Sequence, residues 1–351
     1  MDRFEWTIGV TGLNATDNPG PGISVIRSLR AHPGFNGKII GLAYHYLDPG
    51  LYASDLIDSA YLIPLPSEGV QSLRKRLKYI KTVTDLSMLI PTLDSEMSGF
   101  ISLEPELREI GIRMFLPTQQ QYDIRSKIRL GEICEKTGFD YPQTRIVSDI
   151  ESLFQVSAEI SFPYMLKGIF YGASLVKTMD EASMAFHRTV AQWGLPVIIQ
   201  EFLIGEEYDV LAVGDGKGEI VGGLSMKKTS LTDKGKGWAG VVVNNPKFLT
   251  MAETFCQVTK WRGPFEMEIL KTKDERYFLI EINPRFPAWT YLCVGADQNL
   301  PVAVAQLAMG VKPQSLPESK AGTMFVRISL EQVVKIDRLE EIISKGEIHY
   351  T

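Results

Sequence analysis

Two pairs of oxygen-bearing side chains near residue 270 are the part of this chain best suited to chemistry. Glu266 and Glu268 lie two positions apart in one apolar run, and Glu281 and Asn283 repeat that spacing in the next. Residues two apart point to the same face of a β-strand. Clustered carboxylates repel each other unless a cation holds them, and Mg²⁺ is usually bound through one or two carboxylates together with substrate phosphates. The spacing therefore predicts a magnesium site, with a solvated hairpin face as the alternative.

A β-hairpin is expected to position these residues. Apolar runs at 265–270 and 277–282 flank a polar turn at 273–275. Arg285 follows after a proline that ends the second strand, and its planar guanidinium suits a phosphate or a carboxylate.

The run Glu281-Ile-Asn-Pro-Arg285, with the acid Glu268 thirteen positions upstream, resembles the metal-binding signature of the ATP-grasp superfamily. Most members couple ATP cleavage to the ligation of a carboxylate with an amine or a thiol. The resemblance implies Mg²⁺ or Mn²⁺ held by Glu268, Glu281 and Asn283, with Arg285 as a catalytic residue. Glu266 fits the family spacing less well, and it either tunes the metal or faces the substrate.

Two lysines are predicted to bind the phosphates of ATP. Lys167 ends an apolar strand, where a charge needs a partner, and the following Gly172-Ala-Ser174 lets backbone N–H groups approach an anion. The resemblance implies that Lys127 and Lys167 contact phosphates and that Ser174 belongs to the loop above them. Gly168 replaces a common proline, and this loop has fewer glycines than in many relatives.

The segment between two apolar strands at 200–208 is a candidate adenine site. Main-chain groups at Glu201 and Leu203 can read the polar edge of a stacked base, and Glu207 can accept from ribose hydroxyls. The resemblance implies these roles and adds Gln200, where many relatives carry an acid. A plain hairpin with a charged turn is the alternative.

Loops are expected to select the substrate. A stretch rich in Lys and Gly covers 228–240, and Lys227 or Lys228 is predicted to reach the phosphates, with Lys228 as a second catalytic residue. The glycine-rich loop at 14–22 lacks the G-x-G-x-x-G spacing of dinucleotide sites and is expected to line the substrate pocket together with residues 92–96.

The whole chain is of ordinary composition. Its 37 basic and 42 acidic residues give a net charge of −5, so no basic field indicates nucleic acid or an anionic membrane. Three scattered cysteines fit a reducing compartment, and no signal-peptide pattern or membrane-spanning run is present. We therefore expect a cytoplasmic protein without a nucleic-acid or membrane partner, and the resemblance suggests a homodimer.

The expected fold is α/β and α+β. A Rossmann-like domain at 1–117 precedes a two-part ATP-grasp fold at 118–198 and 199–312, and a strand and helix at 313–351 are expected to pack on the ATP-grasp part.

The expected function is that of an ADP-forming ligase that activates a substrate carboxylate as an acyl phosphate and joins it to an amine or another nucleophile. The substrates are expected to be small molecules or peptides. Three alternatives remain: an enzyme like carbamoyl-phosphate synthase or a carboxylase that phosphorylates bicarbonate, a non-catalytic ATP-binding protein, and a nicotinamide oxidoreductase.

Overall fold

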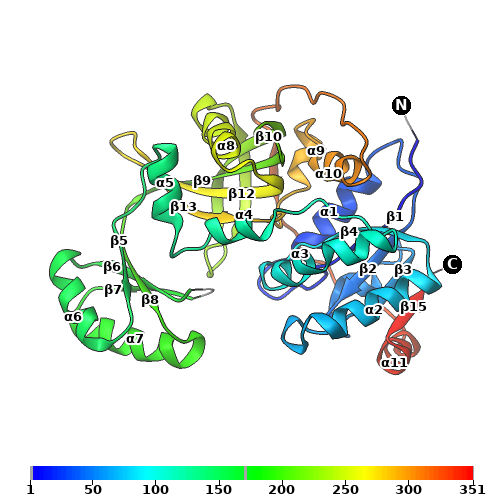
Figure 1. Cartoon of the computed structure of the whole chain (residues 1–351), viewed down its shortest axis with the longest axis horizontal. Coiled ribbons are helices and arrows are strands. Elements are labelled where there is room, and N and C mark those ends of the chain that lie inside the picture. The colour runs from blue at the N-terminus through cyan, green and yellow to red at the C-terminus, as the bar shows by residue number, and fades with distance from the viewer. Residues whose placement is uncertain (1–2, 170–171, 351) are drawn as a thin grey trace. The chain divides into compact units, whose positions relative to one another are not determined.

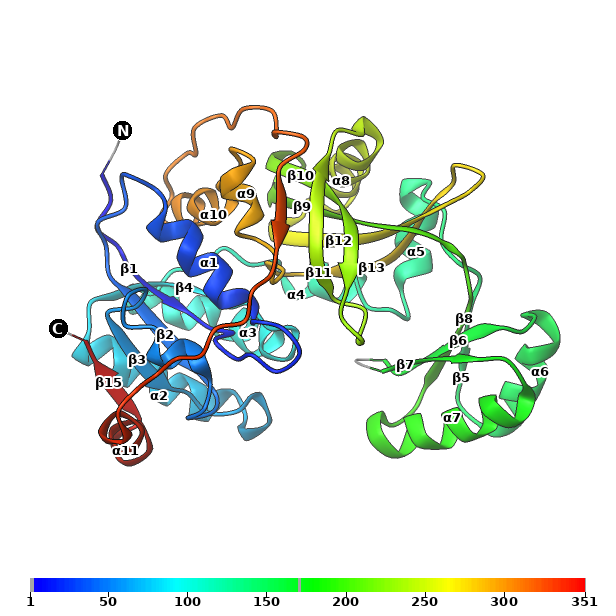
Figure 2. The same ribbon diagram turned by 180° about the vertical axis from the view of Figure 1, so that it is seen from behind.

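The computed structural model describes residues 3–169 and 172–350, and its mixed α/β architecture confirms the predicted fold class (Figures 1 and 2). The chain divides into two compact units. The first contains the described residues of Met1–Tyr122, Asp209–Glu266 and Asn283–Thr351, and the second contains Asp123–Tyr208 and Met267–Ile282.

The helices are α1 (Pro21–Arg30), α2 (Val70–Val83), α3 (Asp94–Glu109), α4 (Gln119–Ile124), α5 (Leu130–Thr137), α6 (Ile150–Glu159), α7 (Met179–Trp193), α8 (Pro246–Thr259), α9 (Leu292–Gly295), α10 (Leu300–Ala308) and α11 (Ile336–Lys345). The strands are β1 (Thr7–Val10), β2 (Ile39–Ala43), β3 (Ser59–Leu62), β4 (Leu86–Ile90), β5 (Thr144–Val147), β6 (Tyr164–Lys167), β7 (Ala173–Val176), β8 (Val197–Glu201), β9 (Gly205–Asp215), β10 (Ile220–Leu231), β11 (Gly237–Val243), β12 (Arg262–Thr272), β13 (Tyr277–Asn283), β14 (Met324–Val326) and β15 (Glu347–His349).

The first unit begins with a five-stranded sheet of order β15-β3-β2-β1-β4. The four strands β3, β2, β1 and β4 are parallel, which is the arrangement of doubly wound α/β domains. Because side chains alternate along a strand, Ile39 of β2 packs with α1 whereas Ile40 packs with α2 and α3. Helices therefore cover both faces of the sheet, with α1 on one side and α2 and α3 on the other (Figures 1 and 2).

The end of the chain completes this sheet. β15 pairs antiparallel with β3, with Ile348 opposite Ala60. Without β15, the main-chain groups along one edge of β3 would lack partners, which explains why a distant segment joins there. The segment 313–351 was expected to pack on the ATP-grasp part. β14 pairs with β11 of the six-stranded sheet, and the N–H groups of Lys320 and Gly322 donate to the carbonyls of Ala296 and Val242. The packing of the whole segment stays a prediction.

The second unit contains a four-stranded antiparallel sheet of order β5-β8-β6-β7. Its core joins buried residues of α6 and α7 to those of this sheet, among them Leu153 of α6, Leu166 of β6 and Ile199 of β8. Asp149 caps α6 by accepting from the Ser152 N–H at 2.7 Å. This small core is separate from the clusters of the first unit.

The third sheet has the order β13-β12-β9-β10-β11-β14, and the predicted hairpin is its β12–β13 pair. The turn is closed by the Thr272 N–H, which donates to the carbonyl of Arg276 at 3.0 Å, and Glu275 takes a positive φ of 62°. The division between the units falls within α4, β9, β12 and β13. The predicted domain boundaries at 117, 198 and 312 stay predictions.

No helix in the described part of the chain is both long and apolar enough to cross a membrane.

Candidate active site

Two lysines and two glutamates of the second unit carry the predicted phosphate and metal chemistry. Glu268 lies on β12 and Glu281 on β13, Lys167 ends β6, and Lys127 lies between α4 and α5. Nζ of Lys127 is 3.5 Å from Oε1 of Glu281, and both side chains are largely shielded from solvent. Elements distant in sequence thus contribute a group of balanced charge.

The ammonium of Lys167 lies in an unfavourable environment. Burial lowers its pKa, the positive charge of Lys127 lowers it further, and the carboxylates of Glu281 and Glu268 act in the opposite direction. Nζ donates a hydrogen bond to Oε1 of Gln200 at 2.6 Å. A buried ammonium beside a second one is stabilised by any added anion, so the two lysines are suited to phosphate oxygens.

Gln200 holds Lys167 in place without neutralising it. Its side chain is buried on β8, and its Nε2 donates to Oγ1 of Thr144 on β5 at 3.0 Å. This second bond fixes the amide so that its oxygen faces Lys167. An acid at this position would form an ion pair with the lysine, whereas the amide leaves the charge available to a ligand.

The other predicted nucleotide-binding residues also belong to the second unit. The Glu201 N–H donates to the carbonyl of Gln143 at 2.8 Å, which ties the end of β8 to the segment before β5. Leu203 and Glu207 are half-buried after β8 and on β9, and Ser174 is half-buried on β7. Their contacts with a nucleotide stay predictions.

Glu266 has a different environment from Glu268, although both lie on β12. Oε1 of Glu266 accepts from Nε1 of Trp289 at 2.6 Å, and Oε2 accepts from Nδ2 of Asn283 at 3.0 Å. The side chain is buried in the first unit, and NH1 of Arg285 lies 3.9 Å from Oε2. Glu266 thus positions its neighbours, among them the predicted ligand Asn283.

Arg285 forms an ion pair with Asp94, the first residue of α3. Its Nε donates to Oδ2 of Asp94 at 2.6 Å, and both side chains are mostly shielded. The other carboxylate oxygen of Asp94, Oδ1, is buried and accepts no hydrogen bond from any described residue. Asp94 follows the carboxyl end of β4, the edge at which open α/β sheets bind ligands.

Lys228 lies inside the first unit as half of a buried ion pair. Its Nζ is 3.2 Å from Oδ1 of Asp209 on β9, and the two side chains are only 5% and 3% exposed. Breaking such a pair leaves an uncompensated buried charge, so Lys228 has a structural role whether or not it also acts on a substrate.

Comparisons with known proteins agree with this architecture. A family model described as "ATP-grasp in the biosynthetic pathway with Ter operon" matches residues 195–330. The carbamoyl phosphate synthase large chain of Clostridium botulinum (strain Eklund 17B / Type B) is 22% identical over 288 residues, covering 75% of this chain and 25% of that protein. The chain thus spans about a quarter of the length of that relative.

Two solved structures share the fold. The biotin carboxylase domain of 2-oxoglutarate carboxylase from Hydrogenobacter thermophilus, bound to MgADP, ADP and bicarbonate, has a TM-score of 0.67 at 15% identity and covers 88% of this chain and 70% of its own. L-amino acid ligase from Bacillus licheniformis has a TM-score of 0.63 at 12% identity and covers 88% and 75%. These comparisons and the family-model match over residues 195–330 agree in pointing to the ATP-grasp superfamily. The resemblance seen in the sequence is confirmed.

The donors at the predicted metal position are of the kind that suits Mg²⁺. Across residues 3–169 and 172–350, no three His, Cys, Asp or Glu side chains gather as a metal-binding group. Mg²⁺ needs only one or two carboxylates when phosphates and water complete its shell, and Glu268 and Glu281 supply two. The nitrogen of Asn283 donates to Glu266, so its amide oxygen would be the ligating atom.

Sequence reasoning missed several partners of the predicted site residues. Thr144 and Trp289 gave no local signal, because each acts through a partner distant in the chain. Asp209 did give one. It immediately precedes the apolar run 210–213 of β9, and an acid in the buried part of a strand requires a cation.

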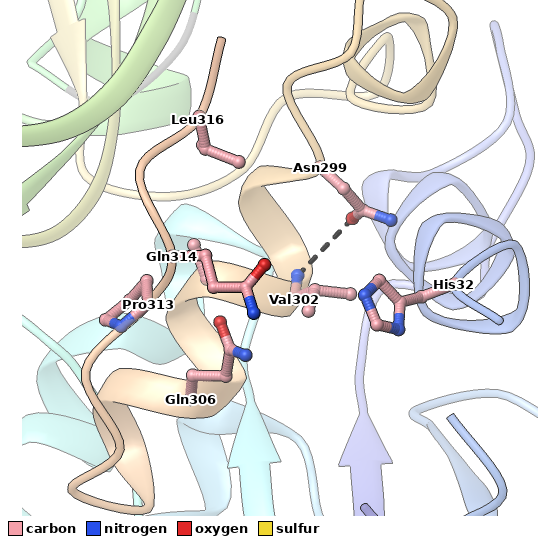
Figure 3. A pocket seen from close by; sticks show the side chains of 8 residues that line it. His32, Asn299, Val302, Gln306, Pro313, Gln314 and Leu316 are labelled. Carbon is pink, nitrogen blue, oxygen red and sulfur yellow. Dashed lines mark hydrogen bonds between the residues drawn. The ribbon is translucent and has the colours of Figure 1, made fainter. Parts of the chain in front are cut away.

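A small cavity of about 110 Å³ lies in the first unit (Figure 3). Its lining residues are His32, Asn299, Val302, Ala303, Gln306, Pro313, Gln314 and Leu316. None of the residues predicted to bind nucleotide, metal or substrate is among them.

Proposed function

We propose that this protein is an ATP-dependent, ADP-forming ligase that converts a substrate carboxylate into an acyl phosphate and joins it to an amine or another nucleophile. One observation carries the proposal: Lys127, Lys167, Glu268 and Glu281 form a cluster in which an amide, not an acid, faces Lys167. Two cations and two anions are what a metal–triphosphate complex requires, because carboxylates hold the metal and ammonium groups hold the phosphates.

The residues of the second unit bind and orient ATP in this proposal. Gln200, Glu201 and Leu203 contact adenine, and Glu207 accepts from the ribose hydroxyls. Lys127, Lys167 and Ser174 bind the phosphates. Glu268 and Glu281 would hold Mg²⁺, as would Asn283 of the first unit, and the ion would neutralise phosphate charge.

The reaction requires activation because a carboxylate at neutral pH is a poor electrophile. The substrate carboxylate attacks the γ-phosphorus, the bond from that phosphorus to the bridging oxygen breaks, and ADP leaves. Arg285 and Lys228 stabilise the negative charge that develops during the transfer. The nucleophile then attacks the acyl carbon, phosphate leaves, and an amide forms when the nucleophile is an amine.

An orphaned acceptor supports an amine as the nucleophile. Asp94 has one oxygen engaged by Arg285 and one buried oxygen that no described residue satisfies. Oδ1 of Asn14, in the loop expected to line the substrate pocket, is likewise buried without a donor from the described residues. Buried acceptors of this kind are costly unless a ligand or water donates to them, and an ammonium or amine supplies N–H donors.

The test is ADP release from the purified protein with Mg²⁺ and ATP, measured over a matrix of acids and amines with mass spectrometry of the product. An amide product formed with one ADP per bond supports the proposal. Glu281→Gln should lower this turnover by about 100-fold or more, since metal interactions contribute several kcal/mol to the transition state. Glu275→Gln, in the exposed turn of the same hairpin, is the matched control and should leave turnover unchanged. Equal activity of both variants would remove the metal assignment.

Bicarbonate is the second candidate carboxylate. The comparisons favour it, since one relative is a carbamoyl phosphate synthase large chain and one solved structure is a biotin carboxylase domain bound to bicarbonate. If bicarbonate is the acceptor of the phosphate, ADP release should depend on added bicarbonate and persist without any organic acid. Release that needs an organic acid and ignores bicarbonate would exclude it.

A further inference from the structure

An exposed apolar segment follows the edge strand of the six-stranded sheet. Residues 328–337 are all exposed, ten in a row, and Ile328, Leu330 and Val333 are 71%, 76% and 94% exposed. Upstream, Met324 and Val326 of β14 are also exposed, so every even position from 324 to 330 presents a large aliphatic side chain to solvent. Contiguous apolar surface of this kind marks interaction sites on soluble proteins.

The backbone of the same segment has an open edge. β14 is the last strand of its sheet, paired only with β11 among the described strands. The Arg327 N–H donates to the carbonyl of Trp238 on β11 at 3.1 Å. Along a strand, main-chain groups alternate between the two edges, so those of Val326 and Ile328 point away from β11. From 328 to 334 the main chain forms no hydrogen bond with the described parts of the protein. An open edge of this kind is a template for another strand.

Two charged residues of the segment lack counter-ions. Arg327 donates through Nε to the carbonyl of Gly237 at 3.0 Å, but its terminal nitrogens meet no carboxylate of any described residue. Glu331, four positions later, is exposed and forms no ion pair with the residues that the structure describes. The two charges are opposite and lie on the same side of an extended chain, since both positions are odd.

We propose that the segment 324–334 pairs antiparallel with the same segment of a second copy of this chain, about a two-fold axis at Ser329. In this register Arg327 of each copy faces Glu331 of the other, and Ile328 faces Leu330. Met324 faces Val334, and Phe325 faces Val333. Each pair occurs twice, as a two-fold interface requires.

The self-complementarity is what selects a second copy as the partner. A shift of one residue toward the N-terminus places the axis between Ile328 and Ser329, and Arg327 then faces Leu330 of the other copy. Centring the axis on Arg327 sets the two arginines against each other, which is unfavourable. Only the axis at Ser329 pairs opposite charges and also uses the free edge of the strand. In this register the even residues, whose main-chain groups point away from β11, exchange hydrogen bonds between the two copies. The two Ser329 residues then face each other as a non-hydrogen-bonded pair.

The first experiment measures the mass of the full-length protein in solution by light scattering over a range of concentrations. Wild type is expected to approach twice the 39.3 kDa chain mass as concentration rises. Leu330→Glu should shift the dissociation constant at least tenfold toward the monomer. Leu47→Glu, at a leucine that is 59% exposed elsewhere in the first unit, is the matched control and should behave as wild type. A monomer at every concentration, or a dimer unaffected by Leu330→Glu, would overturn the proposal.

The second experiment tests the register. Glu331→Arg should weaken the dimer, and adding Arg327→Glu to the same chain should restore it, because the exchanged charges again face each other. Ser329→Cys should give a disulfide-linked dimer on mild oxidation, since directly opposed residues in such pairs lie about 4.5 Å apart between Cα atoms, within disulfide range. Gln332→Cys, which would lie about 20 Å from its own copy, should not. The native cysteines are buried and give little background. Failure of the charge exchange together with equal cross-linking of both cysteine variants would refute this register.

Discussion

Glu266 and Glu268 show how two acids of one strand can have unlike roles. Glu266 accepts from Trp289 and Asn283 in a buried setting, whereas Glu268 acts electrostatically on Lys167. We predict that Glu266→Ala lowers the free energy of unfolding by about 1–3 kcal/mol, because it orphans buried donors. Glu268→Gln should instead leave stability within about 0.5 kcal/mol and abolish most ADP release. Urea unfolding and an ADP assay on both variants check this. The reverse pattern would exchange their roles.

Variants of the buried ion pair between Lys228 and Asp209 can distinguish a structural role of Lys228 from a catalytic one. Lys228→Met alone should destabilise the protein by about 3–5 kcal/mol, since Asp209 would stay buried without its cation. The double variant with Asp209→Leu removes both charges and should recover most of that loss. If Lys228 also serves the reaction, the recovered protein stays inactive. Recovery of both stability and ADP release would restrict Lys228 to a structural role.

At the scale of elements, the connection from β4 to α3 is fixed by one buried carboxylate. Glu96 accepts from the N–H groups of Thr92 and Leu93 at 2.7 and 2.9 Å and from the hydroxyls of Thr11 and Tyr44. Burial raises its pKa, and these hydrogen bonds lower it in part. This acid was expected near the substrate, but its oxygens are used to close the loop that carries Asp94.

The raised pKa of Glu96 gives a pH prediction. A carboxyl whose pKa is higher in the folded state stabilises the fold below its unfolded pKa, and that contribution is lost as pH rises through the folded value. Glu96→Gln cannot ionise and can keep the three bonds to its Oε1 position. The free energy of unfolding of this variant, relative to that of the wild type, should therefore increase as pH rises from 4.5. Urea titrations of both proteins across this range test it, and parallel pH curves would contradict it.

Local patterns were enough to predict the elements but not their partners. The hairpin of β12 and β13 follows from two apolar runs around a polar turn. The partners of Glu266, Lys228 and β15 depend on contacts between residues far apart in sequence. Nothing in a strand's own residues says which distant donor will reach it, so an acid such as Glu266 could not be separated from Glu268 beforehand.

At the scale of the whole molecule, the two units have separate hydrophobic cores, so we predict two unfolding transitions in calorimetry. Leu153→Ala in α6 should lower the free energy of unfolding of one unit and Leu77→Ala in α2 that of the other, each by about 2–5 kcal/mol, because both leucines are fully buried.

The proposed nucleotide-binding lysines and glutamates belong to the second unit. MgADP should therefore raise the midpoint temperature of the transition that Leu153→Ala lowers. When the MgADP concentration is a hundred times its dissociation constant, the free energy of unfolding of that unit should increase by about 2.7 kcal/mol. Lys167→Met should remove this gain, while Lys177→Met, an exposed lysine of the same unit, should keep it. If MgADP raised only the transition sensitive to Leu77→Ala, the phosphate site would have to be sought in the first unit.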